Sequence, residues 1–172
     1  MKATEEAPKA SGAPVELDAA THQALCRLYA LNAHLADEGR WNDWADLFTQ
    51  DCLYLLQPRE NFDRGFPLAT MRYESRGMLL DRAYAVTETL FHDPYYQRHV
   101  VGIPLVMAVR QGRIHSMAHY AVLRTKLSRE TTVFNVGRYL DEVVSTPQGL
   151  KFAVRRAIYD SEMIPNSIIF PI

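Results

Sequence analysis

The sequence predicts an α+β fold, with helices near the N-terminus followed by a long antiparallel sheet that curves into a cone. Two observations carry this prediction. Before Pro94, apolar residues recur every three or four positions, as on one face of a helix, whereas β-branched and aromatic runs dominate after it. Helical segments followed by strands are the α+β order. Because so long a sheet must twist, we expect it to curl around the early helices and enclose one cavity.

The elements before Pro94 can be placed from local signals. A first helix runs from Leu17 to about Glu38, where Gly39 can end it. Asp43 can cap a second, short helix that carries Trp44, Leu47 and Phe48. The remaining segments are a strand over Cys52–Gln57, a loop over Pro58–Pro67 and a helix over Ser75–Thr89.

Four long strands are predicted after Pro94. They are separated by Gly112 and by the short polar segments 128–130 and 147–149, which suit hairpin connections. Consecutive strands joined by hairpins pair antiparallel, so the sheet is expected to be a meander. The four strands are Tyr96–Arg110, Arg113–Leu127, Thr131–Val144 and Leu150–Tyr159.

The chain has 172 residues, enough for one hydrophobic core and too few for two ordinary domains. Residues 1–16 are charged and rich in Ala and Pro, so we expect a flexible arm and not a secretory signal. Residues 17–172 are expected to form a single cone-fold domain with a docked C-terminal tail. The tail should dock, against its own sheet or against a neighbouring chain, because Ile168, Ile169, Phe170 and Ile172 would otherwise expose a large apolar surface.

Composition excludes several classes of function. Lys and Arg number 19 against 20 Asp and Glu, so no positive excess exists to neutralise nucleic acid. No apolar run approaches the roughly 20 residues of a membrane span. Cys26 and Cys52 are the only cysteines and give no disulfide framework, which fits a reducing, cytoplasmic compartment. The sequence lacks GxSxG, GxGxxG and Walker motifs, so neither a nucleophile elbow nor a phosphate-binding loop is predicted.

The histidines raise the possibility of a metal site. His92, Asp93 and His99 have the residue types of an iron-binding facial triad, but Pro94 between them indicates a change from loop to strand. We favour the interpretation that these residues form a hydrogen-bonded pair with a structural role instead of a metal site. His115 and His119 share one strand face, where four residues span roughly 13 Å, too far to chelate one ion together.

A second hypothesis places acid–base chemistry inside the cone. His99, near the start of a strand, could act as a general base, and Asp37 at the end of the first helix could orient it. Tyr54 or Tyr84 could polarise a substrate carbonyl. The alternative is that these side chains only satisfy each other's hydrogen bonds in a core.

Charged residues interrupt the last two strands. They are expected either to form pairs within the chain on a solvated face or to form an interface network with a partner. Arginine suits the second role because its guanidinium binds carboxylates through two hydrogen bonds. The residues concerned are Arg138, Asp141, Arg155, Arg156 and Asp160.

Four segments together resemble the small (β) subunit of Rieske non-haem iron aromatic-ring-hydroxylating oxygenases. They are WNDWADLFTQDCLYLLQPREN, MLLDRAYAVTETLFHDPYYQRHVVGIP, FNVGRYLDE and RRAIYDSEMIPNSIIFPI, and the resemblance spans Thr21 to Ile172. Within the family, LQPRENFDRGFPL, FHDPYYQRHVVG and YDSEMIPNSIIFPI are most similar to the small subunit of salicylate 5-hydroxylase. Anthranilate dioxygenases follow, and terephthalate dioxygenases are more distant.

The resemblance implies the cone fold shared with nuclear transport factor 2, scytalone dehydratase and ketosteroid isomerase. It also implies no catalytic, cofactor-binding or metal residue in this chain. The Rieske [2Fe-2S] cluster and the mononuclear Fe(II) would lie in a large (α) subunit and receive electrons from NAD(P)H through a reductase and ferredoxin. The expected assembly is a hexamer of three α and three β subunits, with the β subunits forming a trimer.

The function implied is structural: the chain would support an α subunit that hydroxylates salicylate or a related ortho-substituted benzoate, with anthranilate next in order. A stand-alone isomerase or dehydratase that uses His99 is the rival function, and a binding module with a ligand in the cone is the third. The family's charged positions that match here are expected in subunit contacts or in ordering of the tail. They are Arg138, Asp141, Arg155, Arg156, Asp160 and Asn166.

Overall fold

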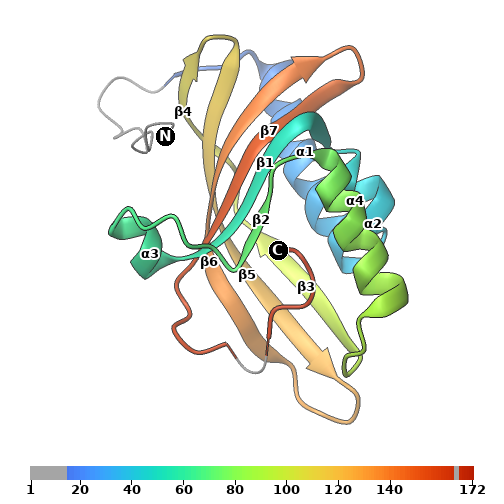
Figure 1. Cartoon of the computed structure of the whole chain (residues 1–172). Helices are drawn as coiled ribbons and strands as arrows, with labels where there is room; N and C mark the ends of the chain where they lie inside the picture. The colour runs from blue at the N-terminus through green and yellow to red at the C-terminus, as the bar shows by residue number, and fades with distance from the viewer. Residues whose placement is uncertain (1–14, 165–166) are drawn as a thin grey trace.

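The computed structural model describes residues 15–164 and 167–172. A strongly curved sheet separates two sets of helices (Figure 1). Helices α1 (Ala19–Asp37), α2 (Trp41–Ala45) and α4 (Arg76–Tyr84) cover one side of the sheet, and the π-helical turn η1 (Ala85–Thr89) continues α4. The short helix α3 (Arg59–Asp63) projects from the opposite side. The predicted arm, 1–16, lies outside the described residues except for its last two positions.

The seven-stranded sheet has the order β2-β1-β7-β6-β5-β3, and β4 pairs with β5 as well. It is mixed and not wholly antiparallel as expected, because β1 pairs in parallel with β7. Without that pairing β7 would present an open edge, which sheets avoid. The strands are β1 (Phe48–Pro58), β2 (Met71–Tyr73), β3 (Tyr95–Val101), β4 (Leu105–Arg110), β5 (Arg113–Lys126), β6 (Thr132–Thr146) and β7 (Gly149–Tyr159).

The first and last predicted helices are confirmed, as is the predicted end of the first helix at Gly39; the structure adds the residues that cap their N-termini. Asp18 accepts a hydrogen bond from the Thr21 backbone N–H at 2.9 Å, and Gly39 follows α1 with a φ of +65° that suits glycine. Ser75 caps α4 by accepting from the Met78 N–H at 3.3 Å. Helical signals in the sequence therefore located both ends of the helical layer.

Three local predictions were wrong. Asp43 does not cap α2 but lies inside it, since its carboxylate pairs with Arg40 one turn earlier, and Phe48 already belongs to β1. The expected loop after Pro58 contains α3. The expected strand Tyr96–Arg110 is two strands, because Pro104 lacks the N–H that a ladder requires.

The end of the chain docks into its own barrel. Ile168 and Ile172 are buried, and the Tyr54 hydroxyl both donates to the Ile172 carbonyl at 2.9 Å and accepts from its N–H at 2.8 Å. Phe170 stacks on Trp41 with ring centroids 5.4 Å apart. The tail thus fills the space between the sheet and the helices, where Figure 1 places the C-terminus.

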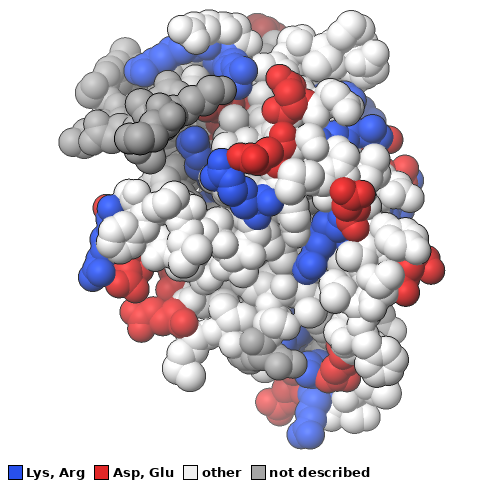
Figure 2. All heavy atoms as spheres, in the orientation of Figure 1, with Lys and Arg blue, Asp and Glu red and all other residues white. Residues whose placement is uncertain are grey.

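Surface charge and hydropathy add two observations. Figure 2 shows acidic and basic side chains interspersed on the face in view, without an extended basic stripe. Among the described residues, no helix combines the length and the apolar character needed to cross a bilayer.

Candidate functional site

A buried ion pair lies at the centre of the cone. Arg155 on β7 and Asp141 on β6 are directly paired in the ladder, and their side chains are 1% and 0% exposed. The Arg155 Nη2 donates to Asp141 Oδ2 at 3.1 Å and its Nε donates to Oδ1 at 3.3 Å. Burial raises the pKa of Asp141, and the charge of Arg155 opposes that rise.

Aromatic rings pack around this ion pair. The guanidinium carbon of Arg155 lies 3.9 Å from the ring centroid of Tyr139, 4.2 Å from that of Phe152 and 5.1 Å from that of Tyr29. Such cation–π contacts are strongest where water is absent. The centre of the cone is therefore occupied by an ion pair and by aromatic side chains of the chain itself.

The position of this pair revises the expectation for two of the six interface candidates. Asp141 and Arg155 were expected in subunit contacts or in ordering of the tail, but both point into the barrel and pair with each other. The reason is strand alternation: Asp141 follows the buried Tyr139 by two residues and so shares its inward face. Neither side chain is accessible to a partner in this fold.

The other candidates lie at the surface or outside the described residues. Arg138 is 3.8 Å from Asp63 of α3, and Asp160 accepts from Arg59, the first residue of α3, at 3.4 Å. Both residues therefore fasten α3 to the sheet. Arg156 is half-buried on the outer face, and Asn166 lies outside the described residues. Contact of these residues with a partner stays a prediction.

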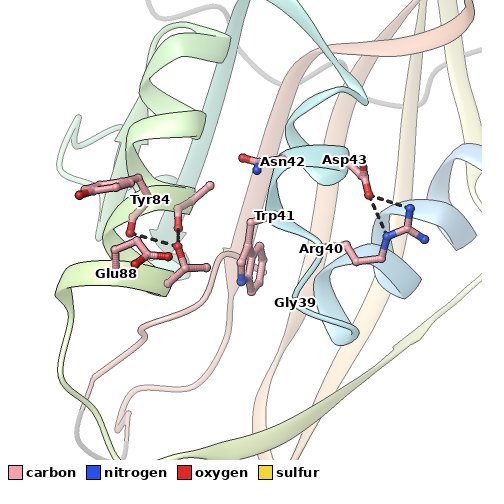
Figure 3. A pocket seen from close by; sticks show the side chains of 9 residues that line it. Gly39, Arg40, Trp41, Asn42, Asp43, Tyr84 and Glu88 are labelled. Carbon is pink, nitrogen blue, oxygen red and sulfur yellow. Dashed lines mark hydrogen bonds and ion pairs between the residues drawn. The ribbon is translucent and has the colours of Figure 1, made fainter.

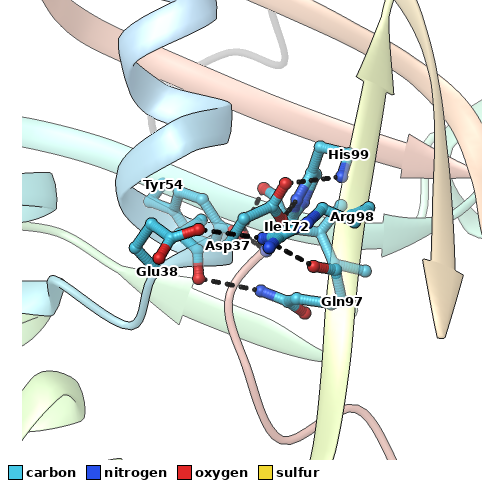
Figure 4. A network of polar contacts seen from close by, with 8 residues as sticks. Asp37, Glu38, Tyr54, Gln97, Arg98, His99 and Ile172 are labelled. Carbon is cyan, nitrogen blue, oxygen red and sulfur yellow. Dashed lines mark hydrogen bonds and ion pairs between the residues drawn. The ribbon is translucent and has the colours of Figure 1, made fainter. Parts of the chain in front are cut away.

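The proposed orienting pair His99–Asp37 is confirmed (Figure 4). Asp37 at the end of α1 accepts from the His99 backbone N–H at 2.9 Å and lies 2.6 Å from its ring Nδ1. The side chains of His99 and Asp37 are 1% and 8% exposed, and the His99 Nε2 has no hydrogen-bond partner among the residues that the structure describes. Next to them, the Gln97 amide donates to the Ala36 carbonyl at 3.1 Å, so this group ties α1 to β3.

The rest of the hypothetical acid–base site does not assemble. The hydroxyl of Tyr54 holds the tail at Ile172, and burial raises the pKa of Tyr54. Tyr84 lies outside the barrel on α4, 63% exposed. A histidine oriented by a carboxylate is thus present, but Ile172 occupies the interior beside Tyr54.

The histidines and acids considered for a metal site point to different partners. Asp93 pairs with Lys126 at 2.5 Å, His92 packs edge-on against Phe170 at 5.1 Å, and His99 binds Asp37. Within residues 15–164 and 167–172, no three His, Cys, Asp or Glu side chains are grouped to hold a metal ion.

A surface groove of about 450 Å³ lies between α2 and the α4–η1 helix (Figure 3). Sequence reasoning missed it, because it arises from the packing of two helices separated by thirty residues. Its walls are formed by Gly39, Arg40, Trp41, Asn42 and Asp43 on one side and Ala83, Tyr84, Thr87 and Glu88 on the other.

Comparison with known proteins identifies the family. The SnoaL-like domain family matches residues 18–156. The small subunit of anthranilate 1,2-dioxygenase from Burkholderia cepacia is 32% identical over 136 residues, covering 79% of this chain and 84% of that protein. This chain belongs to the small-subunit family of aromatic-ring-hydroxylating dioxygenases. Beta subunit 2 of the terminal oxygenase component of terephthalate 1,2-dioxygenase from Comamonas sp. is 28% identical over 149 residues, 85% of this chain and 97% of that one.

Solved structures support the same family and the predicted fold. A beta subunit described as part of an aromatic-ring-hydroxylating dioxygenase from Novosphingobium aromaticivorans superposes with a TM-score of 0.79 at 30% identity, covering 88% of this chain and 95% of that chain. A protein described as a scytalone dehydratase from the same organism has a TM-score of 0.63 at 16% identity over 84% of this chain and 89% of that chain, which shows the fold alone. The cone fold predicted for this small subunit is confirmed.

Proposed function

We propose that this small subunit is a structural component that supports a large subunit hydroxylating salicylate or a related ortho-substituted benzoate, with anthranilate next in order. The observation that carries the structural role is the filled interior, where Arg155, Asp141 and the docked Ile172 occupy the space a substrate would need. The ortho-substituted substrate class is supported by the name of the anthranilate dioxygenase relative.

The proposed assembly assigns the redox chemistry to the partner. The large subunit would hold a Rieske [2Fe-2S] cluster and a mononuclear Fe(II), and electrons would reach them from cytoplasmic NAD(P)H through a reductase and ferredoxin. Three large and three small subunits would form the hexamer, with the small subunits in a trimer. The small subunit would then act by holding the large subunits in a fixed mutual arrangement.

Reconstitution tests this proposal. The small subunit, the large subunit from the same organism and their mixture are each assayed with salicylate, anthranilate, NADH, reductase and ferredoxin. We expect hydroxylated product only when the large subunit is present, and a higher yield or a more stable complex with both subunits. Failure of the two subunits to associate would contradict the structural role. Product from the small subunit alone would contradict the assignment of chemistry to the partner.

One observation favours a second candidate function, a stand-alone isomerase or dehydratase. His99 is held by Asp37 with its Nε2 unpartnered, as a general base would be. Turnover of an enone or hydroxylated substrate by the isolated chain, lost in His99→Ala and retained in the variant His119→Ala at an exposed position, would support that function. Absence of turnover in the wild-type chain would leave His99 as a structural link between α1 and β3.

A further inference from the structure

The groove between α2 and the α4–η1 helix combines an aromatic floor with an acidic rim. Trp41 is only 5% exposed and rests on Phe170 of the tail, so its indole is fixed in place. In Figure 3, Trp41 and Asn42 project from α2 toward the facing wall, which carries Tyr84 and Glu88. The volume of about 450 Å³ is large enough for one long side chain and part of its backbone.

Charge in the groove is unbalanced. Arg40 and Asp43 pair with each other at 2.7 Å, so their charges largely cancel. Glu88 is exposed and forms no ion pair within the part of the chain that the structure describes. The lining therefore carries a net charge of −1: one positive residue, Arg40, against the two negative residues Asp43 and Glu88.

Exposed apolar residues continue from the groove toward the start of β3. Tyr84 is 63% exposed, Leu90 38%, and Phe91 is fully exposed. Contiguous exposed apolar residues mark interaction sites, and aromatic residues are enriched in the cores of protein–protein interfaces. The intervening turn, Ala85–Thr89, is π-helical, a distortion often found at functional sites.

We propose that this groove receives a lysine or arginine side chain of the large oxygenase subunit. Its cationic head would lie against the Trp41 indole and pair with Glu88, while Tyr84 and Phe91 pack against apolar residues around it. A cation held by an aromatic face and a carboxylate, inside an aromatic rim, is the composition of an interface hot spot. This inference rests on the proposed function, since it assigns the surface through which that partner binds.

Affinity measurements on the full-length chain with the purified large subunit test the inference. Glu88→Lys should weaken binding at least tenfold and Glu88→Gln several-fold, because both remove the counter-charge of the inserted cation. Phe91→Ala should weaken binding several-fold. Glu130→Lys, an exposed acidic position in the β5–β6 connection that does not line the groove, is the matched control and should leave the affinity unchanged. Circular dichroism checks that all variants remain folded.

Crosslinking identifies the occupant directly. Thr87 lines the groove and is exposed, so a photo-crosslinking residue at this position should capture a large-subunit peptide that contains Lys or Arg. Capture of a second copy of this chain, or capture of a large-subunit peptide without a basic residue, would overturn the inference. If the wild-type chain fails to bind the large subunit at all, the proposed function fails. If it binds and Glu88→Lys binds equally well, only the groove assignment fails.

Discussion

Breaking the buried ion pair should cost much of this protein's stability. Asp141→Asn keeps the shape of the side chain but leaves the Arg155 guanidinium, 1% exposed, without its counter-charge. Removing one partner of a buried pair typically costs about 3–5 kcal/mol. A chain of this size loses roughly 2–4 °C of melting temperature per kcal/mol, so we expect a fall of about 6–20 °C.

Chemical denaturation of the isolated chain, with unfolding followed by tryptophan fluorescence, measures this effect. The matched control is the double variant Asp141→Leu with Arg155→Met, which removes both charges and fills similar volume. Such replacements are often neutral or stabilising, so the double variant should recover most of the stability that Asp141→Asn loses. Equal free energies of unfolding for Asp141→Asn and the wild type would contradict the interior position of this pair and would indicate that it lies at the surface.

Three further predictions concern single positions. A Cβ at Gly137 would lie 2.1 Å from the Ile158 carbonyl oxygen, so Gly137→Ala should destabilise the chain by about 2 kcal/mol or more in the same denaturation assay. The control is Gly77→Ala in α4, where the added Cβ makes only an ordinary contact at 3.5 Å and the change should be neutral or stabilising. Burial raises the pKa of Cys52 to about 11, so a thiol reagent at pH 8 should modify Cys52 only after the chain unfolds. Rapid labelling of Cys52 in the native chain would be inconsistent with its burial. The hydrogen bond from Lys126 lowers the pKa of Asp93 from its usual 3.8. The pairing therefore stabilises the fold above pH 3.8, and this stabilisation is lost as the pH falls through the lowered pKa. An NMR titration should show the Asp93 pKa rising in Lys126→Met, and an unchanged pKa would argue against the contact.

Much of the helical layer could be read from local signals, and its tertiary contacts could not. Gly39 marks the end of the first helix because its effect acts within one turn. The parallel pairing of β1 with β7 joins Leu53 to Val154, and no local pattern specifies so distant a partner. The same distance hid the role of Tyr54, whose hydroxyl binds a residue 118 positions away.

The burial of Asp141 could have been predicted from the sequence. Alternation along β6 places Asp141 on the same face as Tyr139, and a buried tyrosine there implies a buried carboxylate in need of a cation. The pairing of His99 with Asp37 could be proposed because the predicted strand placed His99 near its start and the predicted helix placed Asp37 near its end. The groove could not be foreseen, since it depends on how α2 and α4 pack.

The central claim, that the interior of this chain is structural and the chemistry belongs to its partner, is tested most directly by one structure. Crystals of the small subunit in complex with its large subunit, soaked with salicylate, would locate both iron and substrate. The account predicts both within the large subunit, with Ile172 still bound to the Tyr54 hydroxyl inside this barrel. Substrate or metal bound beside His99, in place of the tail, would contradict it.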